Sequence, residues 1–81
     1  MKLVFTAKAF KDYENLSLKL QALVDKQLES LLLNIQYPSL KAKKYDESQD
    51  IWSLRLNRNY RLFFRIIDDT YLIITISKHP K

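Results

Sequence analysis

The chain of 81 residues contains no cysteine, no glycine, two prolines and one histidine. Each of these scarcities limits the structures and sites that the protein can form. Without cysteine it has neither a disulfide framework nor thiolate ligands for a metal, which is typical of a reducing compartment. Without glycine its helices lack the residue that most often ends a helix. No apolar run approaches the roughly 20 residues that a membrane span needs.

Length and composition indicate one small globular domain over residues 1–81. Domains usually need roughly 100 residues each, which leaves no room for a second core. Hydrophobic residues make up 47% and charged residues 28% of the chain, as in ordinary globular proteins. The first five residues turn polar too soon for a secretory signal peptide. We therefore expect a cytoplasmic protein without a membrane partner.

Positive charge is concentrated in the second half of the chain. The formal net charge is +5: residues 1–40 hold five lysines against four acids, whereas residues 41–81 hold nine Lys or Arg against five acids. The four arginines lie within eleven positions, at Arg55, Arg58, Arg61 and Arg65. This asymmetry indicates an anionic partner, either nucleic acid or an acidic protein segment. The alternative is a basic surface that serves only solubility.

The first half of the chain predicts a short strand followed by two helices. Residues 3–5 form an apolar run typical of a strand, and Thr6 is a suitable N-cap for a helix from Ala7 to about Leu16. Ser17 is suited to cap a second helix, which Pro38 must end. From Leu18 onward this second helix carries an apolar stripe with spacings of three and four over Leu20, Leu23, Val24, Leu28, Leu31, Leu32 and Ile35.

After the second helix the pattern changes to strands. Three β-rich runs cover residues 51–57, 60–67 and 71–77, and Asn and Asp in the turns between them tolerate unusual backbone angles. We expect an antiparallel three-stranded meander. The fold class is then α+β, with a short N-terminal strand, a two-helix hairpin and one twisted sheet. Residues 41–45 fit either a further edge strand or a loop.

Alternation assigns the side chains of the predicted strands to two faces. One face should pack under the long helix as the core: Trp52, Leu54, Leu56, Tyr60, Leu62, Phe64, Ile66, Leu72, Ile74 and Ile76. The other face is open and carries Ser53, Arg55, Arg61, Arg65, Thr75, Ser77 and His79, with Ile51, Phe63, Tyr71 and Ile73 among them.

Three arginines and a histidine on one open sheet face predict a site for phosphate and stacked bases. Arginine suits this role because its planar guanidinium can donate two hydrogen bonds to one phosphate. Lysine and glutamate would serve a merely solvated face equally well, yet neither occurs in the three predicted strands. The single histidine gains significance only from sharing a face with the arginines.

Four segments resemble the RelE/ParE toxin superfamily in their order and spacing: PSLKAKK at 38–44, IWSLRL at 51–56, YRLFF at 60–64 and ISKH at 76–79. The layout of strand, two helices and meander also resembles that superfamily over essentially the whole chain. The stretch 68–79 is most similar to the YoeB/Txe branch. The resemblance implies the toxin of a type II toxin-antitoxin system. It further implies an mRNA interferase, an endoribonuclease that needs no metal or other cofactor and cuts translated mRNA in the ribosomal A site through the RNA's own 2′-hydroxyl.

The same resemblance implies roles for individual residues. Arg61 matches the arginine that stabilises charge on the scissile phosphate, and Arg55 matches a basic residue that contacts the same phosphate region. His79 matches the general acid that protonates the leaving 5′-oxygen. Further contacts to mRNA or to 16S ribosomal RNA are expected from Lys43, Lys44, Arg58, Arg65, Lys78 and Lys81.

The chain departs from the YoeB branch in two places. Pro80 stands where that branch has a tyrosine after its histidine. Ala42 lies near the position of the branch's glutamate base, while Glu47 and Asp50 lie on the following loop. The sequence therefore does not assign a residue as the general base.

Two other functions fit the same sequence. One is a ParE-like inhibitor of DNA gyrase, which shares the fold but has no nuclease site. The other is a non-catalytic RNA- or protein-binding module, including a decayed toxin. The superfamily resemblance also implies a cognate antitoxin, often an acidic segment that folds on binding. Such a segment could lie beside the sheet or displace residues 78–81.

Overall fold

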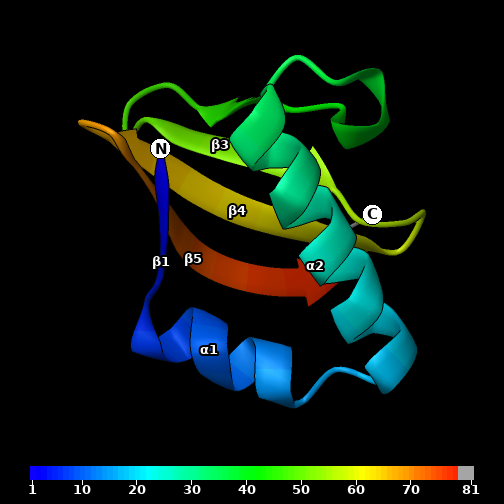
Figure 1. Cartoon of the computed structure of the whole chain (residues 1–81). Coiled ribbons are helices and arrows are strands. Elements are labelled where there is room, and N and C mark those ends of the chain that lie inside the picture. Colours follow the sequence, from blue (N-terminus) through cyan, green and yellow to red (C-terminus); the bar gives the residue numbers. More distant parts are fainter. Residues whose placement is uncertain (79–81) are drawn as a thin grey trace.

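The structure is a computed structural model that describes residues 1–78. In chain order its elements are β1 (Lys2–Phe5), α1 (Ala7–Glu14), α2 (Leu18–Leu33), the 3₁₀ turn η1 (Pro38–Leu40), β2 (Lys43–Asp46), β3 (Ile51–Arg55), β4 (Tyr60–Ile67) and β5 (Thr70–Lys78). As Figure 1 shows, α2 crosses one face of the sheet and α1 lies along its β5 side. No helix in this part of the chain is both long and apolar enough to cross a membrane.

One five-stranded sheet has the strand order β1-β5-β4-β3-β2. The predicted meander of β3, β4 and β5 is confirmed, as are the N-terminal strand and the two helices. β1 runs parallel to β5. The segment left open between strand and loop forms β2, an edge strand antiparallel to β3.

Both helices begin at the predicted caps. The Thr6 hydroxyl accepts a hydrogen bond from the N–H of Ala9 at 3.1 Å, and the Ser17 hydroxyl accepts one from the N–H of Leu20 at 3.2 Å. These bonds satisfy N–H groups that a helix start leaves without a partner. α1 is shorter than predicted, and α2 ends with Asn34 as its C-cap, four residues before the proline expected to stop it.

Side chains of α1 protect the part of β5 that β1 does not reach. β1 pairs only with residues 70–73 of β5. Beyond them, Thr6 Oγ1 donates to the carbonyl oxygen of Ile74 at 3.0 Å. The Asp12 carboxylate accepts hydrogen bonds from the Ile76 N–H at 3.1 Å and the Thr75 hydroxyl at 2.8 Å. α1 therefore replaces a strand along an edge that would otherwise expose unpaired backbone groups.

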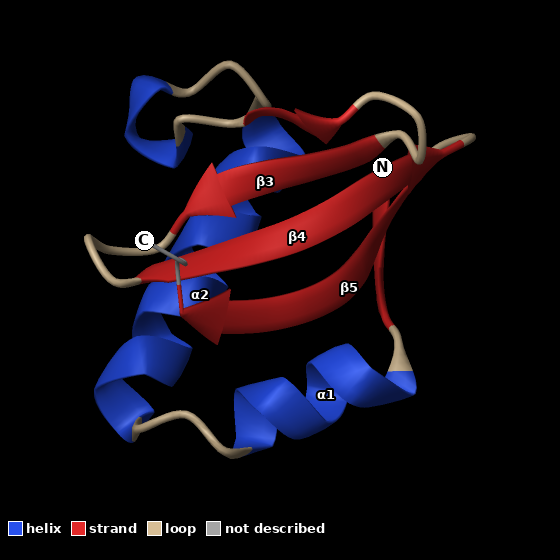
Figure 2. Ribbon diagram, turned by 180° about the vertical axis from the view of Figure 1, so that it is seen from behind, coloured by secondary structure: helices blue, strands red, loops and turns tan. Residues whose placement is uncertain are grey.

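The core lies between α2 and the sheet face that it covers. Its largest fully buried side chains come from α2, η1 and the three meander strands: Val24, Leu31, Leu40, Leu54, Leu62, Phe64 and Ile73. The core assignments for β3 and β4 are thus confirmed at Leu54, Leu62 and Phe64. Figure 2 shows the opposite face of β3, β4 and β5, which no helix of residues 1–78 crosses.

The strand register of β5 contains one irregularity that the sequence did not reveal. Phe63 of β4 pairs with Thr75, whereas the next residue, Phe64, pairs with Ile73. Ile74 is therefore an extra residue in β5. A one-residue bulge of this kind reverses the alternation of faces along the strand.

The predicted faces of β5 are consequently right after the bulge and wrong before it. Tyr71 and Ile73 were expected on the open face, but they are 6% and 0% exposed in the core. Leu72 and Ile74 were expected in the core, but they lie on the other side of the sheet, where both flank Arg65. The open face is therefore more apolar than the sequence indicated.

Candidate functional site

The open face, meaning the face of β2 to β5 that lies away from α2, carries its side chains in rows set by strand register. Paired residues on neighbouring antiparallel strands point to the same side. The arginine row contains Arg55, Arg61 and Ser77, and the next row contains Lys43, Ser53, Phe63 and Thr75. The structure thus brings two predicted catalytic arginines together on the open face.

Arg55 and Arg61 stand directly opposite each other on β3 and β4. Like charges in this position normally destabilise a strand pair. Within residues 1–78, none of the ion pairs involves either arginine. An anion between them would remove the repulsion, so the pair is suited to bind a phosphate.

Hydrogen bonds orient the side chain of Arg61 and hold the main chain of Arg55. The guanidinium of Arg61 donates to the carbonyl oxygens of Asn57 at 2.9 Å and Tyr60 at 3.2 Å. Both bonds come from one terminal nitrogen, so three of the five N–H donors of the guanidinium are left for a ligand. On the other strand, the carbonyl oxygen of Arg55 accepts a hydrogen bond at 2.7 Å from the buried side chain of Gln27 on α2.

The two predicted lysines of β2 lie on opposite faces. Lys43 pairs with Ser53 in the open-face row. Lys44 lies 5.1 Å from the ring centroid of Trp52, on the core side, and forms an ion pair with Asp50. The hydrogen bond to Asp50 raises the pKa of Lys44, and the same bond lowers the pKa of Asp50. Lys44 is therefore engaged within the protein and is not grouped with the arginines.

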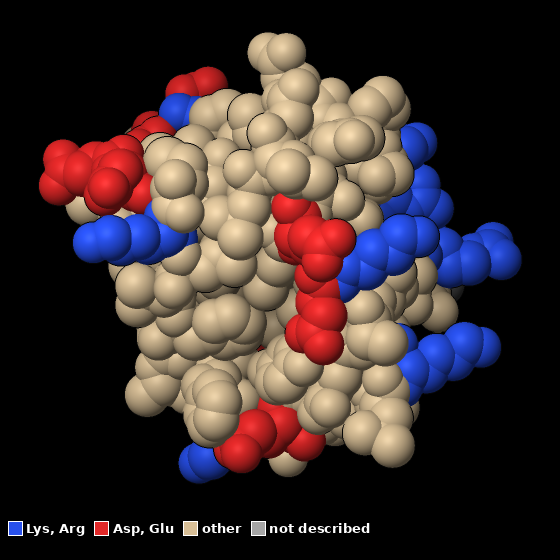
Figure 3. Space-filling model, viewed as in Figure 1, with Lys and Arg blue, Asp and Glu red and all other residues tan. Residues whose placement is uncertain are grey.

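Two of the other predicted RNA contacts, Arg58 and Lys78, lie at the end of the sheet that holds the arginine row, whereas Arg65 lies farther along β4, opposite Leu72. Arg58 is exposed in the turn between β3 and β4, Lys78 is exposed at the end of β5, and Arg65 is exposed near the bulge. Figure 3, which is seen from the side that α2 covers, shows Lys and Arg side chains gathered along the right edge of the molecule. His79 and Lys81 lie outside the described residues.

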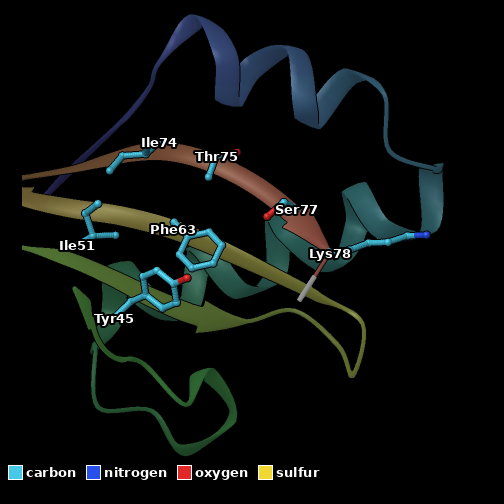
Figure 4. Close-up of a pocket in the computed structure, with 7 residues that line it drawn as sticks. All are labelled: Tyr45, Ile51, Phe63, Ile74, Thr75, Ser77 and Lys78. Carbon is cyan, nitrogen blue, oxygen red and sulfur yellow. The ribbon is translucent and has the colours of Figure 1, made fainter. Parts of the chain in front are cut away.

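A hollow of about 360 Å³ adjoins the arginine row on the open face (Figure 4). It is lined by Tyr45, Ile51, Phe63, Ile74, Thr75, Ser77 and Lys78. The rings of Tyr45 and Phe63 pack edge to face, with centroids 4.8 Å apart and planes at 65°. No carboxylate within residues 1–78 lines this hollow, so its surroundings favour an anionic or neutral ligand.

Sequence reasoning missed Tyr45 and misplaced Ile74. Had residues 41–45 been assigned as a strand, alternation would have placed Tyr45 on the same side as Lys43. The position of Ile74 depends on the bulge, for which an almost continuously apolar run gives no signal. The sequence pattern therefore did not predict the hollow, although it did predict the arginines beside it.

Comparison with known proteins yields one family and several similar folds. The family model for the ParE toxin of the type II toxin-antitoxin system, parDE, matches residues 3–80. No curated protein matches the chain significantly. A solved YoeB/ParE toxin from Agrobacterium tumefaciens has a TM-score of 0.85 at 19% identity, covering 99% of this chain and 100% of the other.

Two toxin-antitoxin complexes contain similar chains. A chain of the YoeB-YefM complex from Staphylococcus aureus has a TM-score of 0.80 at 22% identity. A chain of the intact E. coli RelBE toxin-antitoxin complex has a TM-score of 0.74 at 22% identity. Each alignment covers 99% of this chain and 98% of the other. At these identities the solved structures establish the fold.

Proposed function

The chain belongs to the family of ParE toxins of type II toxin-antitoxin systems, and from this premise we propose that it is an endoribonuclease that cuts translated mRNA without a metal ion. One observation carries this proposal. Arg55 and Arg61 stand opposite each other without an ion pair among the described residues, on a sheet face that no described helix covers. This arrangement is suited to the backbone phosphates of single-stranded RNA.

The proposed reaction uses a nucleophile that the RNA itself supplies. The 2′-hydroxyl loses its proton to a base and attacks the adjacent phosphorus, while the bond to the 5′-oxygen breaks and that oxygen takes up a proton. A 2′,3′-cyclic phosphate and a free 5′-hydroxyl result. Arg61 and Arg55 neutralise the negative charge that grows on the phosphorus oxygens. Because backbone carbonyls already orient Arg61, this stabilisation requires little rearrangement.

Proton transfer to the leaving oxygen is assigned to His79 on the superfamily resemblance alone. The general base stays unassigned. Asp50, one of the carboxylates near the expected position, is paired with Lys44. Charge stabilisation and positioning often dominate phosphoryl chemistry, so the reaction does not depend on a strong base.

We propose two kinds of partner. The substrate complex is mRNA on the ribosome, with 16S ribosomal RNA contacts from basic residues around the arginine row. The inhibitor is a cognate antitoxin with an acidic segment, because a net charge of +5 and an uncovered basic face attract such a segment. Two of the similar folds come from toxin-antitoxin complexes, which supports an antitoxin here.

Inhibition of DNA gyrase is the second candidate function. It is favoured by the family match itself, because the ParE-like branch of the superfamily acts on gyrase and needs no nuclease site. The arginine row argues for RNA cleavage instead, since a gyrase inhibitor does not require paired arginines beside a hollow. A non-catalytic binding module is the third reading, and the same experiment distinguishes it.

The test is induction of the gene without antitoxin, followed by mapping of new 5′ ends on a reporter mRNA. Wild type is compared with Arg61→Ala, His79→Ala and the control Lys26→Ala, which removes an exposed charge from α2. We expect growth arrest and cuts inside translated codons for wild type and Lys26→Ala, and neither for the other two. Arrest with altered plasmid topology and no new ends would replace this proposal with gyrase inhibition. No arrest and no cuts would indicate a binding module.

A further inference from the structure

The hollow beside the arginine row combines apolar walls with a polar rim. Its apolar surface comes from Ile51, Phe63, Ile74 and the ring of Tyr45, and the hydroxyl of Ser77 lies at its border (Figure 4). Apolar surface that is exposed and concave is favourably covered by a ligand. The question is which ligand this hollow accepts.

Strand geometry links the hollow to the arginines. Phe63 lies two residues from Arg61 on the same strand and the same face, which is roughly 7 Å along β4. Ser77 pairs with Arg61, and Thr75 pairs with Phe63. A ligand whose anionic group binds the arginine row therefore reaches the hollow with its neighbouring part.

Tyr45 is held over this face by the residue before it. Lys44 is bound on the core side to Asp50 and to the ring of Trp52. The register shift between residues 44 and 46 makes Tyr45 a bulged residue of β2. Tyr45 is 57% exposed although its ring packs against Phe63. Edge-to-face packing leaves ring surface free for another flat group.

We propose that the ring of Tyr45, supported edge to face by the buried ring of Phe63, forms the stacking platform for one unstacked base of the RNA strand whose phosphate binds Arg55 and Arg61. The inference rests on the proposed function and names a subsite of that same site. A base has a flat apolar face for the ring of Tyr45 and a polar edge for the hydroxyl of Ser77, whereas the Thr75 hydroxyl is already bound to Asp12 and Lys8. Charge also fits, because the walls within residues 1–78 contain no carboxylate and include Lys78.

A peptide segment fits the hollow less well than a base does. Its backbone would bring N–H and C=O groups over Ile51, Ile74 and the rings, where the floor offers them no hydrogen-bond partner. A base places its polar atoms at its edge instead. The hollow therefore favours RNA over an antitoxin segment.

The platform is tested with a short single-stranded 2′-O-methyl RNA that contains 2-aminopurine, whose fluorescence falls when the base stacks on an aromatic ring. The 2′-O-methyl group removes the nucleophile, so the RNA stays intact. We expect wild type and Tyr45→Phe to quench the probe. Tyr45→Ala should bind about tenfold or more weakly and lose most of the quenching. Tyr37→Ala is the matched control, because Tyr37 is also a half-exposed tyrosine but lies before η1.

A second variant and a second measurement separate stacking from folding and from charge. Phe63 is 8% exposed, so Phe63→Leu keeps its apolar packing while it removes the ring. Because Tyr45 then loses its edge-to-face partner, Phe63→Leu should also quench the probe less than wild type does. The slope of log affinity against log salt should be unchanged in Tyr45→Ala, since no cation is lost. Arg61→Ala should reduce this slope by about 0.7, the value for one phosphate contact on a single strand.

Two outcomes would overturn the platform, and they bear differently on the proposed function. If wild type cuts mRNA and Tyr45→Ala quenches the probe as wild type does, the hollow does not stack a base and the nuclease proposal stands. If wild type neither cuts mRNA nor quenches the probe, both proposals fall.

Discussion

The guanidinium of Arg61 donates hydrogen bonds to its own turn, so its role could be to hold the turn, to bind substrate or to do both. Arg61 is bound in this way to Asn57 and Tyr60. The decisive feature is its neighbour, because no structural need explains a second arginine directly opposite it on β3. Two guanidinium groups at one register position, with no ion pair to either among residues 1–78, are destabilising unless an anion binds them. The arrangement is thus better explained by a ligand than by folding.

We predict that Arg61→Ala lowers the rate of mRNA cleavage several hundredfold, which corresponds to about 3 to 4 kcal/mol of transition-state stabilisation. Its folding stability should fall by only about 1 kcal/mol, the usual net value of a side-chain hydrogen bond. Arg61→Lys should not restore activity, because a single ammonium group cannot both hydrogen-bond the turn and donate two parallel hydrogen bonds to a phosphate. Single-turnover cleavage and urea unfolding measure the two effects, and cleavage at the wild-type rate by Arg61→Ala would refute the role.

At this scale the sequence predicted the open-face positions of the arginines and of Phe63 and missed Tyr45. Arg55 and Arg61 lie on strands with clear alternation, so their shared face followed from the pattern. Lys44 was grouped with them, but an ion pair to Asp50 depends on how the loop after β2 folds. Tyr45 escaped notice because its segment was not assigned as a strand. Catalytic roles, including that of His79, stay predictions.

In the contact between α1 and β5, one carboxylate supplies the hydrogen bonds that a neighbouring strand would otherwise give to β5. Asp12 accepts hydrogen bonds from the Ile76 N–H, the Thr75 hydroxyl and the ammonium group of Lys8. The first of these takes the place of a strand ladder bond. Without Asp12 that N–H would be left at a partly buried edge without a protein partner.

We predict that Asp12→Ala lowers the free energy of unfolding by about 1 to 3 kcal/mol, the usual loss when a hydrogen-bonded group is removed from a buried partner. Asp12→Asn should lose less, because an amide oxygen can still accept from the Ile76 N–H. Urea unfolding measures both values, with an unchanged slope as the sign that the same structure unfolds. Equal stability of wild type and Asp12→Ala would show that solvent or a moved chain replaces the contact.

Asp12 should also make stability depend on pH. Burial favours the neutral carboxyl, but the hydrogen bonds from Lys8, Ile76 and Thr75 together outweigh burial and hold the pKa of Asp12 below its ordinary value of 3.8. A carboxyl with a lowered folded pKa stabilises the protein above its unfolded pKa, and this stabilisation is lost as pH falls through the folded pKa. The difference in unfolding free energy between wild type and Asp12→Asn should therefore shrink below about pH 4. A difference that is constant down to about pH 2 would contradict this account.

Element by element, the sequence predicted what local patterns encode. The N-caps, the two helices and β4 followed from capping residues and periodicity. The parallel pairing of β1 with β5 joins the two ends of the chain, which no local pattern can express. The bulge at Ile74 was hidden because the run from Tyr71 to Ile76 is apolar at nearly every position. Period two cannot be read where both faces are apolar.

For the whole molecule, the single α-helical layer has a functional consequence. α2 covers one face of the sheet, and the other face of β3 to β5 is left without a described helix (Figure 2). An uncovered face costs free energy in a small domain, which buries a modest fraction of its surface. A partner that covers this face would stabilise the fold by binding the native state alone. Both proposed partners, RNA and antitoxin, fit this role.

The position of the positive charge, rather than its total, should determine RNA binding. Arg55→Ala with Arg61→Ala and Lys19→Ala with Lys26→Ala each remove two charges from a net of +5. The lysines lie exposed on α2, whereas the arginines share the open face. General attraction to a polyanion depends on net charge and would weaken equally in both pairs. Direct phosphate contacts would weaken only in the arginine pair, and the slope of log affinity against log salt would fall there by about 1.4.

This comparison is made by titrating the 2′-O-methyl RNA into each double variant at several salt concentrations. We expect the lysine pair to retain nearly the wild-type slope and the arginine pair to lose most of its affinity. Equal slopes for the two pairs would mean that the protein attracts RNA only as a basic surface. The arginine row would then not be a phosphate-binding site. A protein target would in that case be the better explanation of what this family member acts on.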